Sequence, residues 1–293
     1  MKKAVSFRSG HFRSFDGTPI YYEVRGQGEP IVFIYGLACL INHWHFQIEH
    51  FSQTHQVIAF DIRAHHRSGI PSDPQNMSLD AIGKDIPYLL RELGIRKAHF
   101  AGHSFGAPSM LKTYEHSPEL FKSMVFINGF AKNPIRGMFG LDLVEPIFKF
   151  VKTNYEKNPG VFDLIWKKIV ENPLSILGSG LVGGFNLNLT QLKDIEIYAR
   201  GVAQMSLRVF MPYFEDMMAF NGEKIASQVR VPTLIISGDK DMVTPLQFQE
   251  DLHHLIKKSE FVRIPYGSHC TQLDFPDYIN LKMDRFFAEI EKK

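Results

Sequence analysis

A serine flanked by small residues is the first candidate for chemistry in this sequence. The segment GHSFG at residues 102–106 lies between a short apolar run, residues 98–101, and a helical pattern at residues 105–116. A sharp turn from a strand into a helix crowds the backbone, so it needs small residues two positions before and after the serine. We therefore expect Ser104 at the carboxyl edge of a sheet, over a helix N-terminus whose dipole favours a developing negative charge.

An imidazole and two carboxylates follow near the end of the chain. Asp239 and Asp241 come directly after one predicted strand, and His269 comes after the next. A serine hydroxyl becomes an effective nucleophile when a neutral imidazole takes its proton and a carboxylate fixes the tautomer of that imidazole. Since parallel strands end at one edge of a sheet, these residues predict acyl transfer through a covalent intermediate on Ser104.

The elements that would position these residues alternate between strand and helix. Continuous apolar runs, typical of strands buried on both faces, occur at residues 30–35, 57–60, 98–101, 123–127 and 231–236. Two antiparallel strands are expected before them, at residues 6–14 and 18–25, and a last strand at residues 260–264. Helical patterns at residues 78–93, at residues 105–116 and from about residue 277 complete the core. This alternation predicts a parallel sheet with helices on both faces.

The alternation stops at residues 131–225, where apolar residues recur at helical spacing and no strand-like run is found. The sequence therefore predicts a core formed by residues 1–130 and 226–293, with residues 131–225 inserted as a helical cap. A glycine-rich apolar stretch at residues 178–185 suits a mobile part of a lid. We expect Leu181 and Phe185 to contact substrate, with packing on the core alone as the alternative.

Several of these segments together resemble the α/β-hydrolase superfamily. They are GHSFG, the spacing G-x-x-D-x-x-x-P that ends at Pro245, the late segment GSH that ends at His269, and Asp61-Ile62-Arg63 after a strand. The resemblance covers nearly the whole chain outside the insertion. It implies a mostly parallel eight-stranded sheet with helices on both faces and an inserted helical cap. It also implies Asp241 as the triad acid, with Asp239 as the rival.

The resemblance further implies an oxyanion hole made by the backbone N–H groups of Leu37 and Phe105. The family commonly has His-Gly before the first of these donors, whereas this chain has Tyr35 and Gly36. The donor is a backbone group, so the hole can persist with a differently supported loop. Tyr35, Gly36 and His103 are expected to lie at the substrate, and His103 to support the turn rather than act as a second base.

Another departure is the segment DIRAHHRS, where Ala64 and His66 replace two glycines of the family pattern. Glycine usually serves a tight turn there, so we expect a differently shaped loop. His65 and His66 are expected to be loop residues, because a metal site needs more convergent ligands. Cys39 and Cys270 flank the proposed site. They are expected to be small apolar fillers, with a redox or substrate role as the alternative.

Composition excludes several other classes of protein. The 33 Lys and Arg residues balance 31 Asp and Glu residues, which gives no argument for binding nucleic acid or an anionic membrane. Two cysteines without a CxxC spacing disfavour a disulfide framework or a structural zinc site. No apolar h-region follows the N-terminal lysines, and no apolar run reaches the ~18 residues of a membrane span. A cytoplasmic protein without stable membrane insertion is expected.

These observations predict a serine hydrolase that cleaves an ester of a largely apolar small molecule, without a metal or an organic cofactor. The same triad in this superfamily also hydrolyses lactones, amides and some carbon–carbon bonds. An epoxide or haloalkane hydrolase is disfavoured, because those relatives have Asp where Ser104 stands. A ligand-binding or signalling protein on a hydrolase scaffold is the alternative of another class. The oligomeric state stays open.

Overall fold

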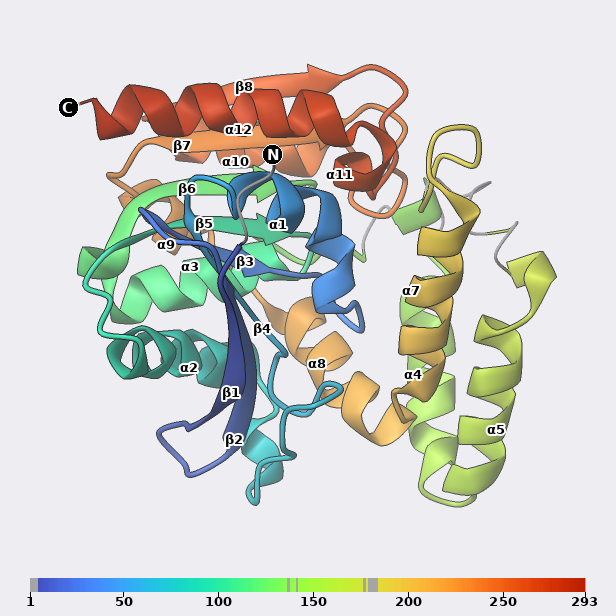
Figure 1. Cartoon of the computed structure of the whole chain (residues 1–293). Helices are drawn as coiled ribbons and strands as arrows, with labels where there is room; N and C mark the ends of the chain where they lie inside the picture. Colours follow the sequence, from blue (N-terminus) through green and yellow to red (C-terminus); the bar gives the residue numbers. More distant parts are fainter. Residues whose placement is uncertain (1–4, 136–137, 141, 176–177, 179–183, 293) are drawn as a thin grey trace.

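The centre of the molecule is an eight-stranded sheet with strand order β1-β2-β4-β3-β5-β6-β7-β8 (Figure 1). The computed structural model describes residues 5–135, 138–140, 142–175, 178 and 184–292. Strand β2 is antiparallel to both β1 and β4, and all other neighbours are parallel, which confirms the predicted mostly parallel sheet. The strands are β1 (Phe7–Arg13), β2 (Pro19–Arg25), β3 (Pro30–Ile34), β4 (Gln56–Phe60), β5 (Ala98–His103), β6 (Phe121–Ile127), β7 (Thr233–Gly238) and β8 (Ser259–Ile264).

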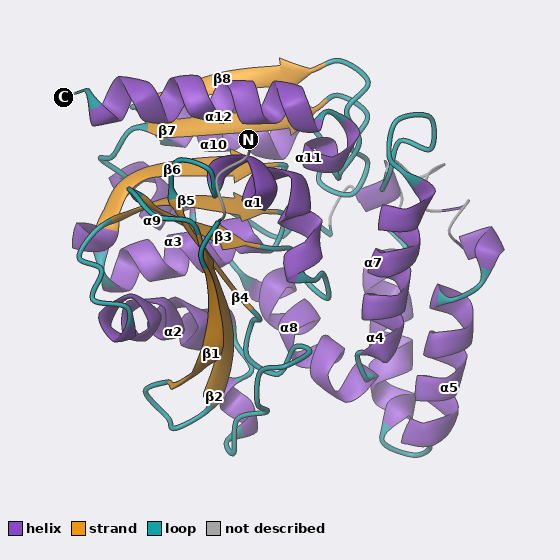
Figure 2. Cartoon of the chain, in the orientation of Figure 1, coloured by secondary structure: helices purple, strands orange, loops and turns teal. Residues whose placement is uncertain are grey.

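Two groups of helices cover the faces of this sheet (Figure 2). Helices α1, α11 and α12 pack together on one face, and helices α2, α3, α9 and α10 pack together on the other. Their bounds are α1 (His45–Phe51), α2 (Leu79–Glu92), α3 (Gly106–His116), α9 (Glu223–Gln228), α10 (Gln247–Leu255), α11 (Thr271–Asp274) and α12 (Pro276–Glu291). Because both faces are covered, the central strands are buried and carry continuous apolar runs rather than an alternating pattern.

The segment expected to be a cap forms helices beyond the carboxyl ends of the parallel strands (Figure 1). Its longer helices are α4 (Val144–Tyr155), α5 (Pro159–Val170), α7 (Leu192–Gln204) and α8 (Leu207–Ala219). Its two ends meet at the core, where Lys132 and Asn221 form an antiparallel bridge and the Gly222 N–H donates to the Ala131 carbonyl over 2.6 Å. No helix in the described part of the chain is long and apolar enough to span a membrane.

A buried ion network holds the loop after β4 against the β1–β2 hairpin. The Arg63 side chain is inaccessible to solvent and donates to Asp85 over 2.8 Å and to Asp16 in the hairpin turn over 2.8 Å. From α8, the Tyr213 hydroxyl donates to the Arg63 carbonyl over 2.9 Å. Moving the loop away would leave a buried charge without its partner, which is strongly unfavourable. These contacts therefore hold the loop in place.

The glycine replacements in this loop do not abolish its tight turn. Ala64 and His66 have φ values of 60° and 44°, in the left-handed region that glycine adopts without a side-chain penalty. An L-residue in that region costs roughly 1–2 kcal/mol, so the surrounding contacts must hold both residues there. These two backbone positions therefore keep a glycine-like conformation, and the expected difference in the shape of the whole loop stays a prediction.

Candidate active site

Ser104 lies on a strained turn between β5 and α3. Its φ is 51°, and its N–H donates to the Ile127 carbonyl of β6 over 3.1 Å. The two flanking glycines are needed for close backbone approach. A Cβ on Gly102 would lie 2.7 Å from the Gly106 carbonyl oxygen, and a Cβ on Gly106 would lie 2.2 Å from the Ile34 carbonyl oxygen. Small residues therefore let α3 start directly against the sheet, with the serine at its N-terminus.

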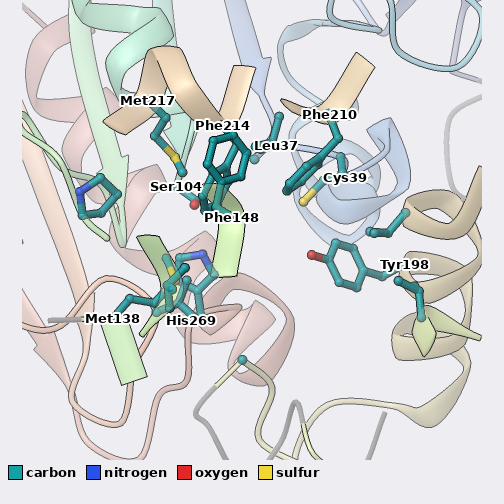
Figure 3. A pocket seen from close by; sticks show the side chains of 18 of the residues that line it. Leu37, Cys39, Ser104, Met138, Phe148, Tyr198, Phe210, Phe214, Met217 and His269 are labelled. Carbon is teal, nitrogen blue, oxygen red and sulfur yellow. The ribbon is translucent and has the colours of Figure 1, made fainter. Parts of the chain in front are cut away.

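His269 lies in the loop after β8 and is paired with the carboxylate of Asp241. The distance from His269 Nδ1 to Asp241 Oδ2 is 2.8 Å. The other carboxylate oxygen, Oδ1, accepts the N–H groups of Val243 and Thr244 over 2.8 and 2.9 Å. A carboxylate can only accept from Nδ1–H, so this pair leaves Nε2 as the basic nitrogen. His269 and Ser104 both line one cavity (Figure 3).

The rival carboxylate, Asp239, is engaged elsewhere. Its Oδ1 accepts the Tyr266 N–H over 2.7 Å, and its Oδ2 lies 3.7 Å from the Arg263 guanidinium. No hydrogen bond joins Asp239 to His269 among the described residues. The geometry therefore favours Asp241 as the residue that orients the imidazole.

Asn128 holds the loop that carries His269, a role that the sequence did not reveal. Its side-chain N–H₂ donates to the carbonyls of Ser268 and His269 over 2.9 and 2.6 Å, and its Oδ1 accepts the Gly238 N–H over 2.8 Å. The Thr244 hydroxyl, 2.8 Å from Asp241 Oδ2, also reaches the Asn128 carbonyl over 2.9 Å. One amide thus joins the ends of β6 and β7 to the histidine loop.

The two expected oxyanion donors are available for a ligand. In the described part of the chain, the N–H groups of Leu37 and Phe105 donate to no protein acceptor. Leu37 lies in the loop after β3, and Phe105 directly precedes α3. A Cβ on Gly36 would lie 3.2 Å from Ser104 Cβ, so glycine lets this loop pass close to the nucleophile.

The adjacent histidines of the loop after β4 support this oxyanion loop. The buried His65 accepts the Ala38 N–H at Nε2 over 3.4 Å, and its Nδ1–H donates to the Arg63 carbonyl over 3.0 Å. His66 Nε2–H donates to the Cys39 carbonyl over 2.7 Å. Burial lowers the pKa of His65 to about 3, which keeps its ring neutral and its Nε2 able to accept.

Comparisons with known proteins identify the family to which this chain belongs. A family model described as the alpha/beta hydrolase fold matches residues 29–276. The chain belongs to the α/β-hydrolase family. Over 277 residues it is 24% identical to a putative carbamate hydrolase, RutD, of Azorhizobium caulinodans, covering 93% of this chain and 96% of the relative. Over 273 residues it is 28% identical to a non-heme haloperoxidase of Rhodococcus erythropolis, covering 87% and 92%.

A similar solved structure is an enol-lactonase from Burkholderia xenovorans LB400. It superposes with a TM-score of 0.74 at 17% sequence identity, over 95% of this chain and 100% of the other. This likeness bears on the fold alone. The family match makes the chain a hydrolase of the α/β family, while the two named relatives are named for different reactions.

The cavity of this α/β-hydrolase has a volume of about 650 Å³ and a largely apolar wall. Helices α4, α5, α7 and α8 contribute nearly half of the residues that line it, and Phe148, Tyr198 and Phe210 are among them (Figure 3). Its aromatic members are Phe130, Phe139, Phe148, Phe162, Trp166, Phe185, Tyr198, Phe210 and Phe214. A cavity of this size can enclose a drug-sized molecule, and its few polar groups would fix the orientation of that molecule.

The residues expected at the substrate divide into three groups. Gly36, His103 and Phe185 line the cavity. Tyr35 does not belong to the lining. Its hydroxyl accepts the Ile62 N–H over 2.9 Å and lies 3.4 Å from Asp61, so Tyr35 contacts the loop after β4 and not the cavity. Leu181 lies outside the described residues.

Two polar features of the wall have no part in the triad. Cys39 and Cys270 are free, buried cysteines at the cavity, and burial raises the pKa of both thiols. His43, which no sequence motif marks, has two buried ring nitrogens that find no hydrogen-bond partner in the part of the chain that the structure describes. Burial lowers its pKa to about 3. Cys39, His43 and His103 form a group that could hold a metal ion.

Proposed function

We propose that this hydrolase cleaves an ester of a largely apolar small molecule through an acyl-enzyme on Ser104. The observation that carries the proposal is the pairing of His269 with Asp241 at the edge of an apolar cavity that Ser104 also lines. A carboxylate that fixes Nδ1–H prepares Nε2 to take the serine proton. The apolar wall would bind the acyl or alkyl part of the substrate, and residues 131–225 would act as its cap.

The mechanism follows from these positions. Ser104 Oγ attacks the ester carbonyl carbon while His269 Nε2 takes its proton, and Asp241 stabilises the imidazolium that forms. The tetrahedral oxyanion accepts the N–H groups of Leu37 and Phe105, and each such donor lowers the barrier by roughly 3 kcal/mol. His269 then protonates the leaving alcohol. In the second half of the reaction His269 takes a proton from a water molecule that attacks the acyl-enzyme, and Ser104 is released with that proton.

Labelling with a fluorophosphonate probe, followed by a panel of p-nitrophenyl esters, tests the proposal. We expect stoichiometric labelling of wild type and none of Ser104→Ala. Ser104→Ala and His269→Ala should each lower kcat by several orders of magnitude, and the double variant should be little worse, because such residues act as a unit. Ester hydrolysis by Ser104→Ala above a tenth of the wild-type rate would contradict the mechanism.

The same panel separates the alternatives. Labelling without turnover of any ester, but with turnover of a lactone, an amide or a carbon–carbon bond substrate, would keep the triad and change the bond that it cleaves. Tight binding of small apolar molecules without labelling would favour the ligand-binding or signalling alternative.

A further inference from the structure

Three potential metal ligands converge beside the nucleophile. One ligand atom from each of Cys39, His43 and His103 lies within 4.8 Å of the other two. These residues are 3%, 3% and 1% exposed, so water hardly competes for them. They come from different parts of the chain: Cys39 from the oxyanion loop, His43 from the short helix that follows it, and His103 from the end of β5.

The nitrogens in this group are free to bind. His103 Nε2–H donates to the His269 carbonyl over 2.8 Å, so Nδ1 carries the lone pair, and within the described part of the chain this nitrogen has no hydrogen-bond partner. Neither ring nitrogen of His43 has a hydrogen-bond partner among the described residues. A buried polar atom without a partner destabilises the folded state, and a bound ligand would remove that cost. Metal-binding histidines commonly donate their second N–H to a backbone carbonyl, as His103 does.

We propose that Cys39, His43 and His103 bind Zn²⁺ and that the bound ion inhibits hydrolysis at Ser104. A thiolate with two imidazoles suits a borderline-soft d¹⁰ cation, and three protein ligands leave the fourth position open to the cavity. Tetrahedral zinc needs ligand atoms about 3.3–3.6 Å apart, given Zn–N and Zn–S bonds of about 2.0 and 2.3 Å. Side-chain rotations on binding would have to bring the three atoms, now within 4.8 Å of one another, to that spacing. On binding, the thiol proton of Cys39 is released to solvent.

Inhibition follows from the position of the group. The sulfur of Cys39, Nδ1 of His103 and Cβ of Ser104 each lie 3.2 Å from one point, the place of a Cβ on Gly36. An ion held by the first two atoms would therefore lie near the serine, where we expect it to hinder the approach of the substrate carbonyl. The ion also holds Cys39 in the loop that carries the Leu37 N–H.

Direct binding is measured first, so that the result does not depend on the substrate. The protein, stripped with a chelator, is titrated with ZnCl₂ by calorimetry, and with Co²⁺ as a spectroscopic probe of thiolate coordination. The variants are Cys39→Ser and His43→Gln, and Cys270→Ser is the matched control, since it is the other buried cysteine at the cavity. Rates with and without zinc are then compared within each variant.

We expect one zinc ion per chain and a cobalt–thiolate charge-transfer band in wild type and in Cys270→Ser. Cys39→Ser should remove the band and weaken zinc binding at least 100-fold, and His43→Gln should weaken it at least tenfold. Zinc should inhibit wild type and Cys270→Ser at concentrations that leave Cys39→Ser active. Equal binding by Cys39→Ser would overturn the site, and full activity of zinc-loaded wild type would overturn the inhibition. If no ester is hydrolysed, the proposed function fails while the binding titration still decides the site.

Discussion

Replacing Asp241 by Asn should abolish activity without unfolding the protein, and the hydrogen bonds around this side chain give the reason. Oδ1 of Asp241 accepts two backbone N–H groups, from Val243 and Thr244. An Asn side chain must therefore turn its carbonyl oxygen toward these donors and its N–H₂ toward His269 Nδ1. The amide then donates where the carboxylate accepted, so the imidazole is forced into the tautomer with its proton on Nε2.

A histidine with Nε2–H cannot take the proton of Ser104, and wrong-tautomer variants of such triads lose roughly 10⁴-fold in kcat. That loss corresponds to a barrier about 5 kcal/mol higher. The fold should persist, because each polar atom keeps a partner. The amide introduced by Asp241→Asn can donate to Thr244, whose hydroxyl can donate to the Asn128 carbonyl 2.9 Å away.

The assay is hydrolysis of p-nitrophenyl butyrate, with thermal unfolding measured on the same samples. Asp239→Asn is the matched control, since Asp239 accepts the Tyr266 N–H and has no bond to His269. It should keep activity within about tenfold of wild type. If Asp241→Asn kept more than a hundredth of wild-type activity, or if Asp239→Asn were the more damaging change, the tautomer argument would be refuted.

Other measurements test the cavity, the turn and the buried histidines. Because a buried methylene contributes about 0.8 kcal/mol, kcat/KM should rise about fourfold per methylene from acetate to at least butyrate or hexanoate esters. Phe210→Asp, at the cavity wall, should flatten this rise, and a preference for acetate over every longer ester would rule out the large apolar substrate. Gly106→Ala should lower the free energy of unfolding by at least about 2 kcal/mol, because its Cβ would lie 2.2 Å from a backbone oxygen. Gly160→Ala, with no atom within 4 Å, should not, and equal stability of both variants would contradict the packing argument. Burial lowers the pKa of His65 to about 3 and that of His99 to about 4, whereas unfolded histidine titrates near 6.5. Below pH 6.5 the unfolded state therefore binds more protons than the folded state. The stabilising contribution of these histidines should be fully present above pH 6.5 and should fall as the pH is lowered. Each of these histidines should remove about 2 kcal/mol of stability between pH 7 and pH 5, and pH-independent denaturant midpoints over this window would count against it.

The fold was predictable from the sequence because its signals are local. Runs such as residues 30–35 and 231–236 are continuous apolar segments between turn residues, and burial on both faces requires that composition. Ser104 could be placed from its neighbours, since the backbone contacts at Gly102 and Gly106 leave no room for a Cβ. The resemblance to the family supplied Asp241, and neighbouring residues alone did not separate it from Asp239.

The tertiary structure decided how these elements are supported and what surrounds them. His65 and His66 hold the oxyanion loop through backbone atoms of Ala38 and Cys39. Asn128 holds the loop of His269 in the same way. Almost every residue carries a backbone N–H and a backbone C=O, and only proline lacks the N–H. A side chain that binds backbone atoms therefore requires no particular residue type at the position it contacts, and the sequence shows no pattern there. The approach of His43 to Cys39 and His103 likewise depends on where a loop, a short helix and a strand end come together, which no local signal in the sequence records.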